Sequence, residues 1–358
     1  MTENLLPIAG RLSSPKPRPM TDESKPQIIT VDPKTPEHDK IERAAAVLRD
    51  GGLVAFPTET VYGLGADAFS DEAVGKIFEA KGRPATNPLI VHVSGVRQAR
   101  ELARHWPDEA AKLAEAFWPG PLTMVVERSD VVAAAVCAGL DTVALRMPSH
   151  PVARKIIEEA GVAVAAPSAN RYTEVSPTTA EHVVQGLGER VDLVVDAGAT
   201  PVGLESTLVS VVDKPAQLLR PGMIGVDQLR QVIEIDEYRR EVVDESEPRP
   251  SPGMAARHYS PDAKLRVVSA AQFRRLVEKR DDQVGLVGFD VKDASMRVER
   301  VEMPDDPEDY ARRLYAVLHR LDDAGVREVV VQSPPKGHRW DAIRDRLRRA
   351  ASTESQTP

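Results

Sequence analysis

Short apolar runs alternate with amphipathic stretches along most of the chain, a pattern typical of strands joined by helices. Residues 38–50 place Ile41 and Leu48 on one face of a helix that Gly51 would end, and a second helix would be capped by Asp71. Further helices are predicted over 96–116, 150–160 and 226–233, and strands over 53–56, 89–93, 122–127, 142–147, 162–166, 193–197, 207–212 and 217–220. Because helices interleave with more numerous strands, we expect one large α/β unit with a mixed sheet.

The composition divides the chain into four segments. Residues 1–27 are rich in proline, serine and charge, which predicts a disordered N-terminal tail before the large unit over 28–235. Residues 236–262 combine charges and prolines with little apolar periodicity, which is the composition of a linker. From 263 to 352 strands and helices alternate again and predict a small βαβα unit, Rossmann-like, with a parallel sheet.

The composition also narrows the class of protein. With Cys137 as the single cysteine, the chain can form neither an intrachain disulfide nor a multi-cysteine zinc site. The first 262 residues hold 28 Lys and Arg against 38 Asp and Glu, which argues against a protein that coats nucleic acid. No apolar run reaches the roughly 18 residues of a membrane span, and the N-terminus has no signal-peptide pattern, so we expect a cytoplasmic protein. We interpret the five arginines of 338–350 as a solvated helix face.

The GLGADA run at 63–68 matches a dinucleotide-binding fingerprint only weakly. The next helix would begin at Asp71 rather than within the run, and Pro88 stands near the place of the expected acidic residue. We therefore expect a tight turn at 63–68. No G-x-x-x-x-G-K-[ST] sequence occurs, so another device must hold any nucleotide.

Polar residues follow the first apolar strand of the large unit. We expect Thr58, Glu59 and Thr60 to be exposed at its end, where ligand-facing loops usually lie. Arg146 ends another apolar strand, in ALRMP. A buried arginine requires an anion, which would be either a structural carboxylate or the carboxylate of a substrate.

The segment KGRPATNPLIVHV at 81–93 carries a second polar group. Lys81 and Arg83 combine a point cation with a forked guanidinium, which suits phosphate oxygens and equally suits a solvated basic turn. His92 lies in an apolar strand, and this position favours a histidine of the core.

Hydroxyl and amide side chains gather after the strand that ends near residue 166. Ser168, Asn170 and Ser176 would line a ligand loop, or the segment would only cap the next helix, for which Thr178 or Thr179 would suffice.

Ser206 and Arg220 add a further hydroxyl and a further cation. There is no G-x-S-x-G sequence and no Ser-His-Asp pattern, so hydrolysis through a serine nucleophile is unsupported. Cations and hydroxyls without an evident nucleophile indicate a site that positions phosphates and an acid rather than attacking covalently.

In order and spacing, these segments resemble the YrdC-type threonylcarbamoyl-AMP synthases in their longer, two-domain form. The segments are PTETVYGLGADA, KGRPATNPLIVHV, ALRMP, APSAN followed by SPT, ESTLV, LLRPG and SPGMAARHYSP. The resemblance covers roughly 28–262 and implies a large domain with a twisted, mixed, open sheet. The C-terminal unit fits the extra small α/β domain of that form.

The resemblance implies a reaction in which L-threonine, bicarbonate or carbon dioxide, and ATP give threonylcarbamoyl-AMP and pyrophosphate, with Mg²⁺ accompanying ATP. The product would pass to threonylcarbamoyl-transferase proteins that modify tRNA to N6-threonylcarbamoyladenosine. Because the carbamate of threonine attacks the α-phosphate, the protein itself needs no nucleophile. Neither a membrane nor tight direct binding of tRNA is expected.

The family's site residues are carried over by motif position. Lys81 and Arg83 resemble the catalytic cations. The threonine contacts would be Thr60, His92, Arg146, Ala166 and Ser206. The ATP contacts would be Arg83, Asn87, Thr142, Ser168, Asn170, Ser176, Arg220 and Tyr259. The segment around Tyr259 resembles an arm that closes over the nucleotide pocket.

The sequence departs from the family's pattern in GMAARHYSP, at Arg171 and Tyr172, and in GHRWDAIRD. Two other function classes compete with a synthase. Carbamoyl transfer in hydrogenase maturation requires a zinc-finger cysteine array, which the single cysteine excludes. A YrdC-like nucleotide- or RNA-binding regulatory protein without synthase activity is the other alternative.

Overall fold

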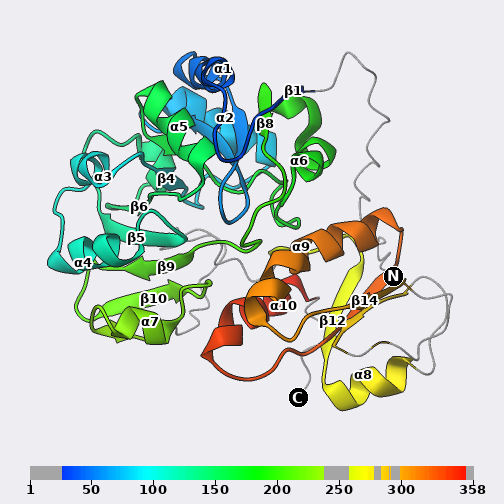
Figure 1. Ribbon diagram of the computed structural model, residues 1–358. Helices are drawn as coiled ribbons and strands as arrows, with labels where there is room; N and C mark the ends of the chain where they lie inside the picture. Colours follow the sequence, from blue (N-terminus) through cyan, green and yellow to red (C-terminus); the bar gives the residue numbers. More distant parts are fainter. Residues whose placement is uncertain (1–25, 238–257, 278–283, 290, 292–298, 352–358) are drawn as a thin grey trace, which may run out of the picture.

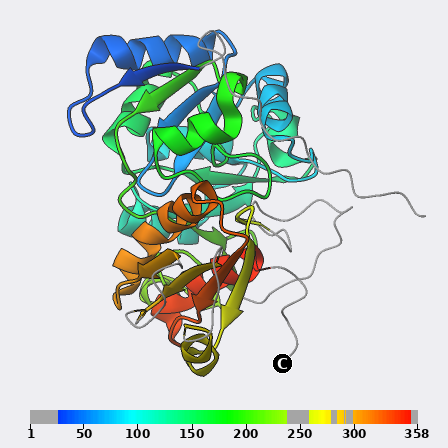
Figure 2. The ribbon, with the colours of Figure 1, turned by 90° about the vertical axis from the view of Figure 1, so that its right-hand side faces the viewer.

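The computed structural model describes residues 26–237, 258–277, 284–289, 291 and 299–351. An eleven-stranded sheet defines a large unit and a four-stranded sheet defines a smaller C-terminal unit, and the two units lie against each other (Figures 1 and 2). Residues 1–25 of the predicted tail and 238–257 of the predicted linker lie outside the described residues.

The sheet of the large unit is mixed, as the pattern predicted. Its strand order is β1-β8-β2-β3-β7-β4-β6-β5-β9-β10-β11, with both parallel and antiparallel neighbours. The strands are β1 (Gln27–Thr30), β2 (Val54–Pro57), β3 (Tyr62–Asp67), β4 (Ile90–His92), β5 (Leu122–Glu127), β6 (Thr142–Arg146), β7 (Val164–Ala165), β8 (Leu193–Asp196), β9 (Thr207–Ser210), β10 (Ala216–Arg220) and β11 (Ile235–Asp236).

Helices cover both faces of this sheet, which is why its central strands are apolar throughout. Val54 and Phe56 belong to the core cluster that includes α1 and α5, whereas Leu53 and Ala55 belong to the cluster that includes α2 and α4. The alternation follows from the period of two in a strand. The helices are α1 (His38–Arg49), α2 (Asp71–Lys81), α3 (Val96–Leu102), α4 (Asp108–Phe117), α5 (Pro151–Ala160), α6 (Ala180–Leu187) and α7 (Val226–Arg230).

Two helix predictions were wrong in detail. The single helix expected over 96–116 is divided into α3 and α4, because the chain is extended at Ala103 and Pro107 occupies the N-cap of α4. The cap of α2 is Ser70, whose side chain accepts a hydrogen bond from the Ala73 amide. Asp71 instead accepts one from the amide of Ala135, at 3.0 Å.

The GLGADA run does not form the tight turn that the sequence suggested. Most of it lies within β3, which pairs with β2 and β7. A Cβ atom on Gly65 would lie 2.6 Å from the ring of Phe56 and 2.8 Å from Val164. This glycine therefore serves close packing in the sheet rather than a phosphate-binding loop.

The C-terminal unit has a fully parallel sheet in the order β12-β15-β13-β14, which confirms the predicted alternation. One strand, β14, was not predicted, because only Val301 of its four residues is buried. The elements are β12 (Lys264–Val268), α8 (Ala270–Val277), β13 (Val284–Gly288), β14 (Glu299–Glu302), α9 (Pro307–Asp323), β15 (Glu328–Gln332) and α10 (Asp341–Ala350).

Helices α9 and α10 of the C-terminal unit contact the large unit (Figure 1). Arg312 of α9 donates a hydrogen bond to the carbonyl of Pro201 at 2.8 Å. The expectation that the arginines of 338–350 form a solvated face was wrong for two of them, since the side chains of Arg346 and Arg349 are 0% and 9% exposed. None of the helices in the described ranges combines the length and the apolar character that a membrane span requires.

Candidate active site

A cavity lies beside the central strands of the large sheet. It is bounded by the β2–β3 turn, the ends of β4, β6 and β10, the loop after β7, the residues before β9, and residues 258–259. Nine of the residues expected from the sequence line it: Thr60, Arg83, His92, Arg146, Ala166, Ser168, Ser206, Arg220 and Tyr259. The topology therefore brings together residues up to 199 positions apart in the sequence. Three polar residues that had not been assigned to ligands, Thr58, Glu205 and His258, also line the cavity.

The polar turn between β2 and β3 is buried rather than exposed, contrary to the sequence-based expectation. Thr58, Glu59 and Thr60 are 2%, 5% and 0% exposed. The hydroxyls of Thr58 and Thr60 lie 2.9 Å apart, and Thr58 also donates to the carbonyl of Val61 at 2.7 Å. A turn whose hydroxyls are held in this way keeps Thr60 fixed at the cavity wall.

Arg146 has the structural carboxylate that a buried arginine requires, and it also lines the cavity. Its Nη2 lies 2.7 Å from Oε1 of Glu59, and the other carboxylate oxygen of Glu59 accepts a hydrogen bond from the Ser149 amide at 3.1 Å. Within the described residues, neither Nε nor Nη2 of Arg146 makes a hydrogen bond of good geometry. The guanidinium therefore retains donors for a second anion.

His92 lies opposite Arg146 in the parallel pairing of β4 with β6. It is 2% exposed, and its ring meets that of Phe56 edge to face. Burial, with the positive charge of Arg146, lowers the pKa of His92 to about 3, so its imidazole is neutral. His92 is therefore a buried histidine, as expected from the strand, and also a wall of the cavity.

Ser206 and Arg220 form one hydrogen-bonded pair at the adjoining ends of β9 and β10. Arg220 donates from Nη2 to the hydroxyl of Ser206 at 3.1 Å and to its carbonyl at 3.0 Å. The hydroxyl of Ser206 also lies 2.7 Å from that of Thr123. The pair presents a hydroxyl and a cation to the cavity from a fixed position.

Arg83 is held by the loop that follows it. Its Nη2 donates to the side-chain oxygen of Asn87 and to the carbonyl of Pro88, both at 2.7 Å. Asn87 is not on the cavity wall, so in this structure it orients Arg83. With Arg146 and Arg220, Arg83 completes three guanidinium groups around one cavity, an arrangement that suits more than one anionic group.

The other expected residues outside the cavity wall have different partners. Lys81 donates hydrogen bonds to the carbonyls of Ser168 and Asn170, so it holds the loop that follows β7. Burial, followed by the neighbouring charge of Arg83, holds the pKa of Lys81 well below its usual value. Ser176 donates to Glu205 Oε1 at 2.6 Å, and Thr142 lies at the opposite end of β6 from Arg146.

The residues around the cavity do not form a metal site of their own. The described parts of the chain contain no group of three or more His, Cys, Asp or Glu side chains that could hold a metal ion. The carboxylates of Glu59 and Glu205 are each engaged by an arginine.

Comparisons with known proteins identify relatives of this chain. The family model described as "Telomere recombination" matches residues 46–222, and "Threonylcarbamoyl-AMP synthase, C-terminal domain" matches 224–352. The threonylcarbamoyl-AMP synthase of Pyrococcus abyssi is 41% identical over 88% of this chain and 95% of its own, and that of Bacillus subtilis is 40% identical over 87% and 93%. A crystal structure of P. abyssi Sua5 complexed with L-threonine superposes with a TM-score of 0.84, at 40% identity over 90% of this chain and 97% of that one.

Proposed function

Because this chain belongs to the two-domain threonylcarbamoyl-AMP synthase family and is a nucleotidyltransferase-type enzyme, we propose that it makes threonylcarbamoyl-AMP from L-threonine, bicarbonate or carbon dioxide, and ATP. The observation that carries this proposal is a single cavity lined by three guanidinium groups and several hydroxyls. One guanidinium suits the carboxylate of an amino acid, and the others suit a polyphosphate. No hydroxyl on the described wall is hydrogen-bonded to a histidine, so the arrangement does not favour covalent catalysis.

The threonine side of the cavity consists of the residues around Arg146. Its Nε, which makes no hydrogen bond within the described residues, would bind the carboxylate of threonine, while its Nη2 keeps the ion pair with Glu59. In our proposal neutral His92 and the hydroxyls of Thr60 and Ser206, which line the cavity, contact the amino and hydroxyl groups, and the backbone at Ala166 closes this side.

The bonds in the proposed reaction form and break between threonine, carbon dioxide and ATP, without a covalent intermediate on the protein. The amine of threonine adds to carbon dioxide and loses a proton, which gives a carbamate. A carbamate oxygen forms a bond to the α-phosphorus of ATP while the bond from that phosphorus to the bridging oxygen breaks, and pyrophosphate leaves. The protein contributes orientation and positive charge, which stabilise the phosphates in the transition state.

The nucleotide side is the wall that carries Arg83, Ser168, Arg220 and Tyr259. In our proposal Asn87, Thr142, Asn170 and Ser176 extend this side, and Lys81 supports it by holding the loop of Ser168. Magnesium would enter bound to the phosphates of ATP, where it offsets their charge, because both nearby carboxylates are engaged by arginines.

The product is a mixed anhydride that decomposes in water, so an enzyme that acts soon after its release has to consume it. We propose that this enzyme transfers the threonylcarbamoyl group to tRNA. We therefore propose threonylcarbamoyl-transferase proteins as downstream partners and the cytoplasm as the location. The net charge of −8 does not favour tight direct binding of tRNA.

Pyrophosphate release tests the proposal. The purified protein, supplied with ATP, magnesium and bicarbonate, should release pyrophosphate with L-threonine, much less with L-serine and almost none without an amino acid. A regulatory YrdC-like protein without synthase activity would bind nucleotide or RNA yet release no threonine-dependent pyrophosphate. A filter-binding assay with tRNA at physiological salt separates that alternative, since we expect no tight complex.

A further inference from the structure

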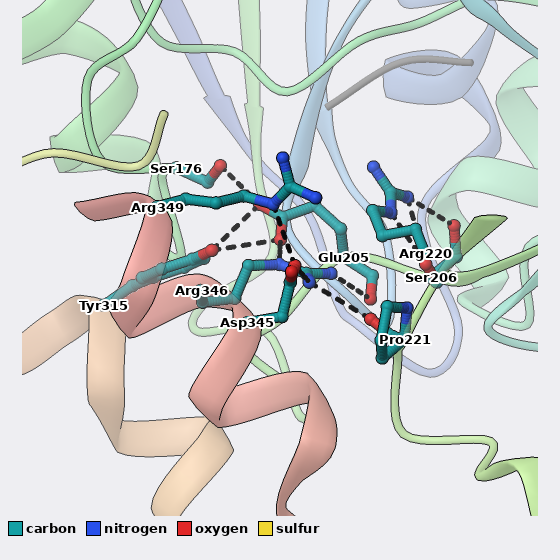
Figure 3. A network of polar contacts seen from close by, with 9 residues as sticks. All are labelled: Ser176, Glu205, Ser206, Arg220, Pro221, Tyr315, Asp345, Arg346 and Arg349. Atoms are coloured by element: carbon teal, nitrogen blue, oxygen red, sulfur yellow. Dashed lines mark hydrogen bonds and ion pairs between the residues drawn. The ribbon is translucent and has the colours of Figure 1, made fainter. Parts of the chain in front are cut away.

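A buried network of charged side chains joins the C-terminal unit to the wall of the cavity (Figure 3). Its centre is the carboxylate of Glu205, which accepts hydrogen bonds from Nε of Arg346 at 2.6 Å, from the hydroxyl of Tyr315 at 3.0 Å and from that of Ser176 at 2.6 Å. Two of these three donors come from the C-terminal unit, Tyr315 from α9 and Arg346 from α10. Neither unit alone completes the network.

The guanidinium of Arg346 holds two backbone segments at once. Its Nη1 donates to the carbonyl of Pro221 at 3.1 Å, and its Nη2 donates to the carbonyl of Glu205 at 3.4 Å. Glu205 immediately precedes Ser206, and Pro221 immediately follows Arg220. Arg346 therefore fixes, from the side of the C-terminal unit, the two segments that present the Ser206–Arg220 pair.

Arg346 also supports the aromatic part of the wall. Its guanidinium carbon lies 5.2 Å from the centroid of the Tyr259 ring, which is within the range of a cation–π contact. The ring of Tyr315 stacks on the same ring, with centroids 6.0 Å apart. Tyr259 is 1% exposed and lines the cavity, so two residues of the C-terminal unit set where it lies.

The charges of the network are matched inside the interface. Asp345 accepts hydrogen bonds from Nη1 of Arg346 at 2.9 Å and from Nε of Arg349 at 3.0 Å. Replacing a matched buried ion pair by apolar side chains is often neutral for stability. Apolar side chains would therefore be enough to hold the two units together. The ion pairs add hydrogen-bond donors whose directions are fixed by the planar guanidinium groups.

We propose that Arg346 is a positioning residue for the nucleotide side of the active site, through Glu205, Ser176, Arg220 and Tyr259. The inference rests on the proposed function and deepens it by giving the C-terminal unit a role in ATP recognition. Threonine should be affected less, because Ser206 is the one proposed threonine contact in a segment that Arg346 holds. Thr60, His92 and Arg146 belong to elements that Arg346 does not contact in the described structure.

The test compares three variants of the full chain. Arg346→Lys keeps the charge but loses the fork, and Tyr315→Phe removes one hydroxyl and is the milder change. Arg312→Ala is the matched control, because Arg312 also bonds across the interface but is 52% exposed and lies away from the cavity wall. Thermal unfolding of each variant establishes that it is folded.

For Arg346→Lys we expect kcat/KM for ATP to fall by about tenfold or more, while the Kd for threonine, measured by calorimetry without ATP, changes by less than about threefold. Tyr315→Phe should also lower kcat/KM for ATP, by a smaller factor, and leave the Kd for threonine nearly unchanged. Arg312→Ala should have the parent's values for both. A folded Arg346→Lys variant with the parent's ATP kinetics, or with equal losses for both substrates, would overturn the proposal.

Calorimetry with a non-hydrolysable ATP analogue separates this proposal from the proposed function. If the unmodified protein releases no threonine-dependent pyrophosphate, the proposed synthase reaction is contradicted. The affinity for the analogue can still be compared between variants, and it tests the role of Arg346 independently. Weaker binding of the analogue by Arg346→Lys than by Arg312→Ala supports the role of Arg346, and equal binding by the two variants contradicts it.

Discussion

Arg146 and Glu59 form an ion pair of 2.7 Å in which the side chains are only 5% and 6% exposed. The pair joins β6 to the turn between β2 and β3, so it is part of the fold as well as part of the cavity. Breaking such a pair by removing one partner costs about 3–5 kcal/mol, because the other charge stays buried and uncompensated. Binding and stability must therefore be measured separately at this position.

Arg146→Ala should lose threonine binding and lower the free energy of unfolding by about 3 kcal/mol. Glu59→Gln keeps an oxygen for the Ser149 amide and leaves the guanidinium in place, so it should retain threonine binding. Calorimetric titration with threonine, alongside denaturant unfolding, measures both effects. Unchanged threonine affinity in a folded Arg146→Ala variant would remove Arg146 from the binding site.

Arg83→Ala should raise the KM for ATP and reduce turnover, with little change in the Kd for threonine. The loss of one charge-assisted contact corresponds to about 1.5–3 kcal/mol. Arg97 is a suitable control, because its side chain is 95% exposed and pairs only with Glu101 among the described residues. Coincident ATP titrations of Arg83→Ala and Arg97→Ala would mean that Arg83 only holds its loop.

The alternation of apolar strands and amphipathic helices was sufficient to predict the mixed sheet and the parallel sheet, because helices cover both faces of each sheet. It was not sufficient for β14, which buries one apolar side chain, or for the division of 96–116 at Pro107. The burial of Thr58 and Glu59 was missed because their partners, Thr60 and Arg146, satisfy them only in the folded turn.

The residues on the cavity wall were predicted mainly through the resemblance of ordered motifs, since the pattern alone left Arg83 undecided and favoured a core histidine for His92. The role of Arg346 was missed for a physical reason. An arginine-rich helix is normally solvated, and nothing local distinguishes Arg346 from Arg348. The distinction arises only when α10 packs against Glu205, 141 residues earlier in the sequence.

Gly65→Ala should destabilise the large unit, because its Cβ would meet Phe56 at 2.6 Å inside a packed sheet. Overpacking of this kind costs about 1–3 kcal/mol. Gly75→Ala, at an exposed position of α2 where nothing lies within 4 Å of the new Cβ, should instead stabilise the fold by about 0.5–1 kcal/mol. Denaturant unfolding of the two variants should therefore shift in opposite directions. Equal shifts would contradict the close packing of β3.

Two histidines stack across the interface between the units. The rings of His182 in α6 and His319 in α9 have centroids 3.8 Å apart and an interplanar angle of 19°. Burial first, and then the neighbouring His319, lowers the pKa of His182 to about 4, and burial also lowers that of His319. Thr178 and the carbonyl of Ser176 are their polar neighbours, and Asp323 is the nearby carboxylate that opposes the shift at His319.

The folded state should therefore lose stability as the pH falls from about 6.5 towards 4. In this range the unfolded chain, with an ordinary histidine pKa of about 6.5, binds more protons than the folded chain, so the free energy of unfolding rises with pH. His182→Gln should reduce this slope without removing it, because burial also lowers the pKa of His92 to about 3. His38→Gln is the control, since the side chain of His38 is 81% exposed. Denaturant unfolding between pH 4.5 and 7 measures the slopes, and a slope for His182→Gln equal to that of the parent would show that the stacked pair is not linked to folding.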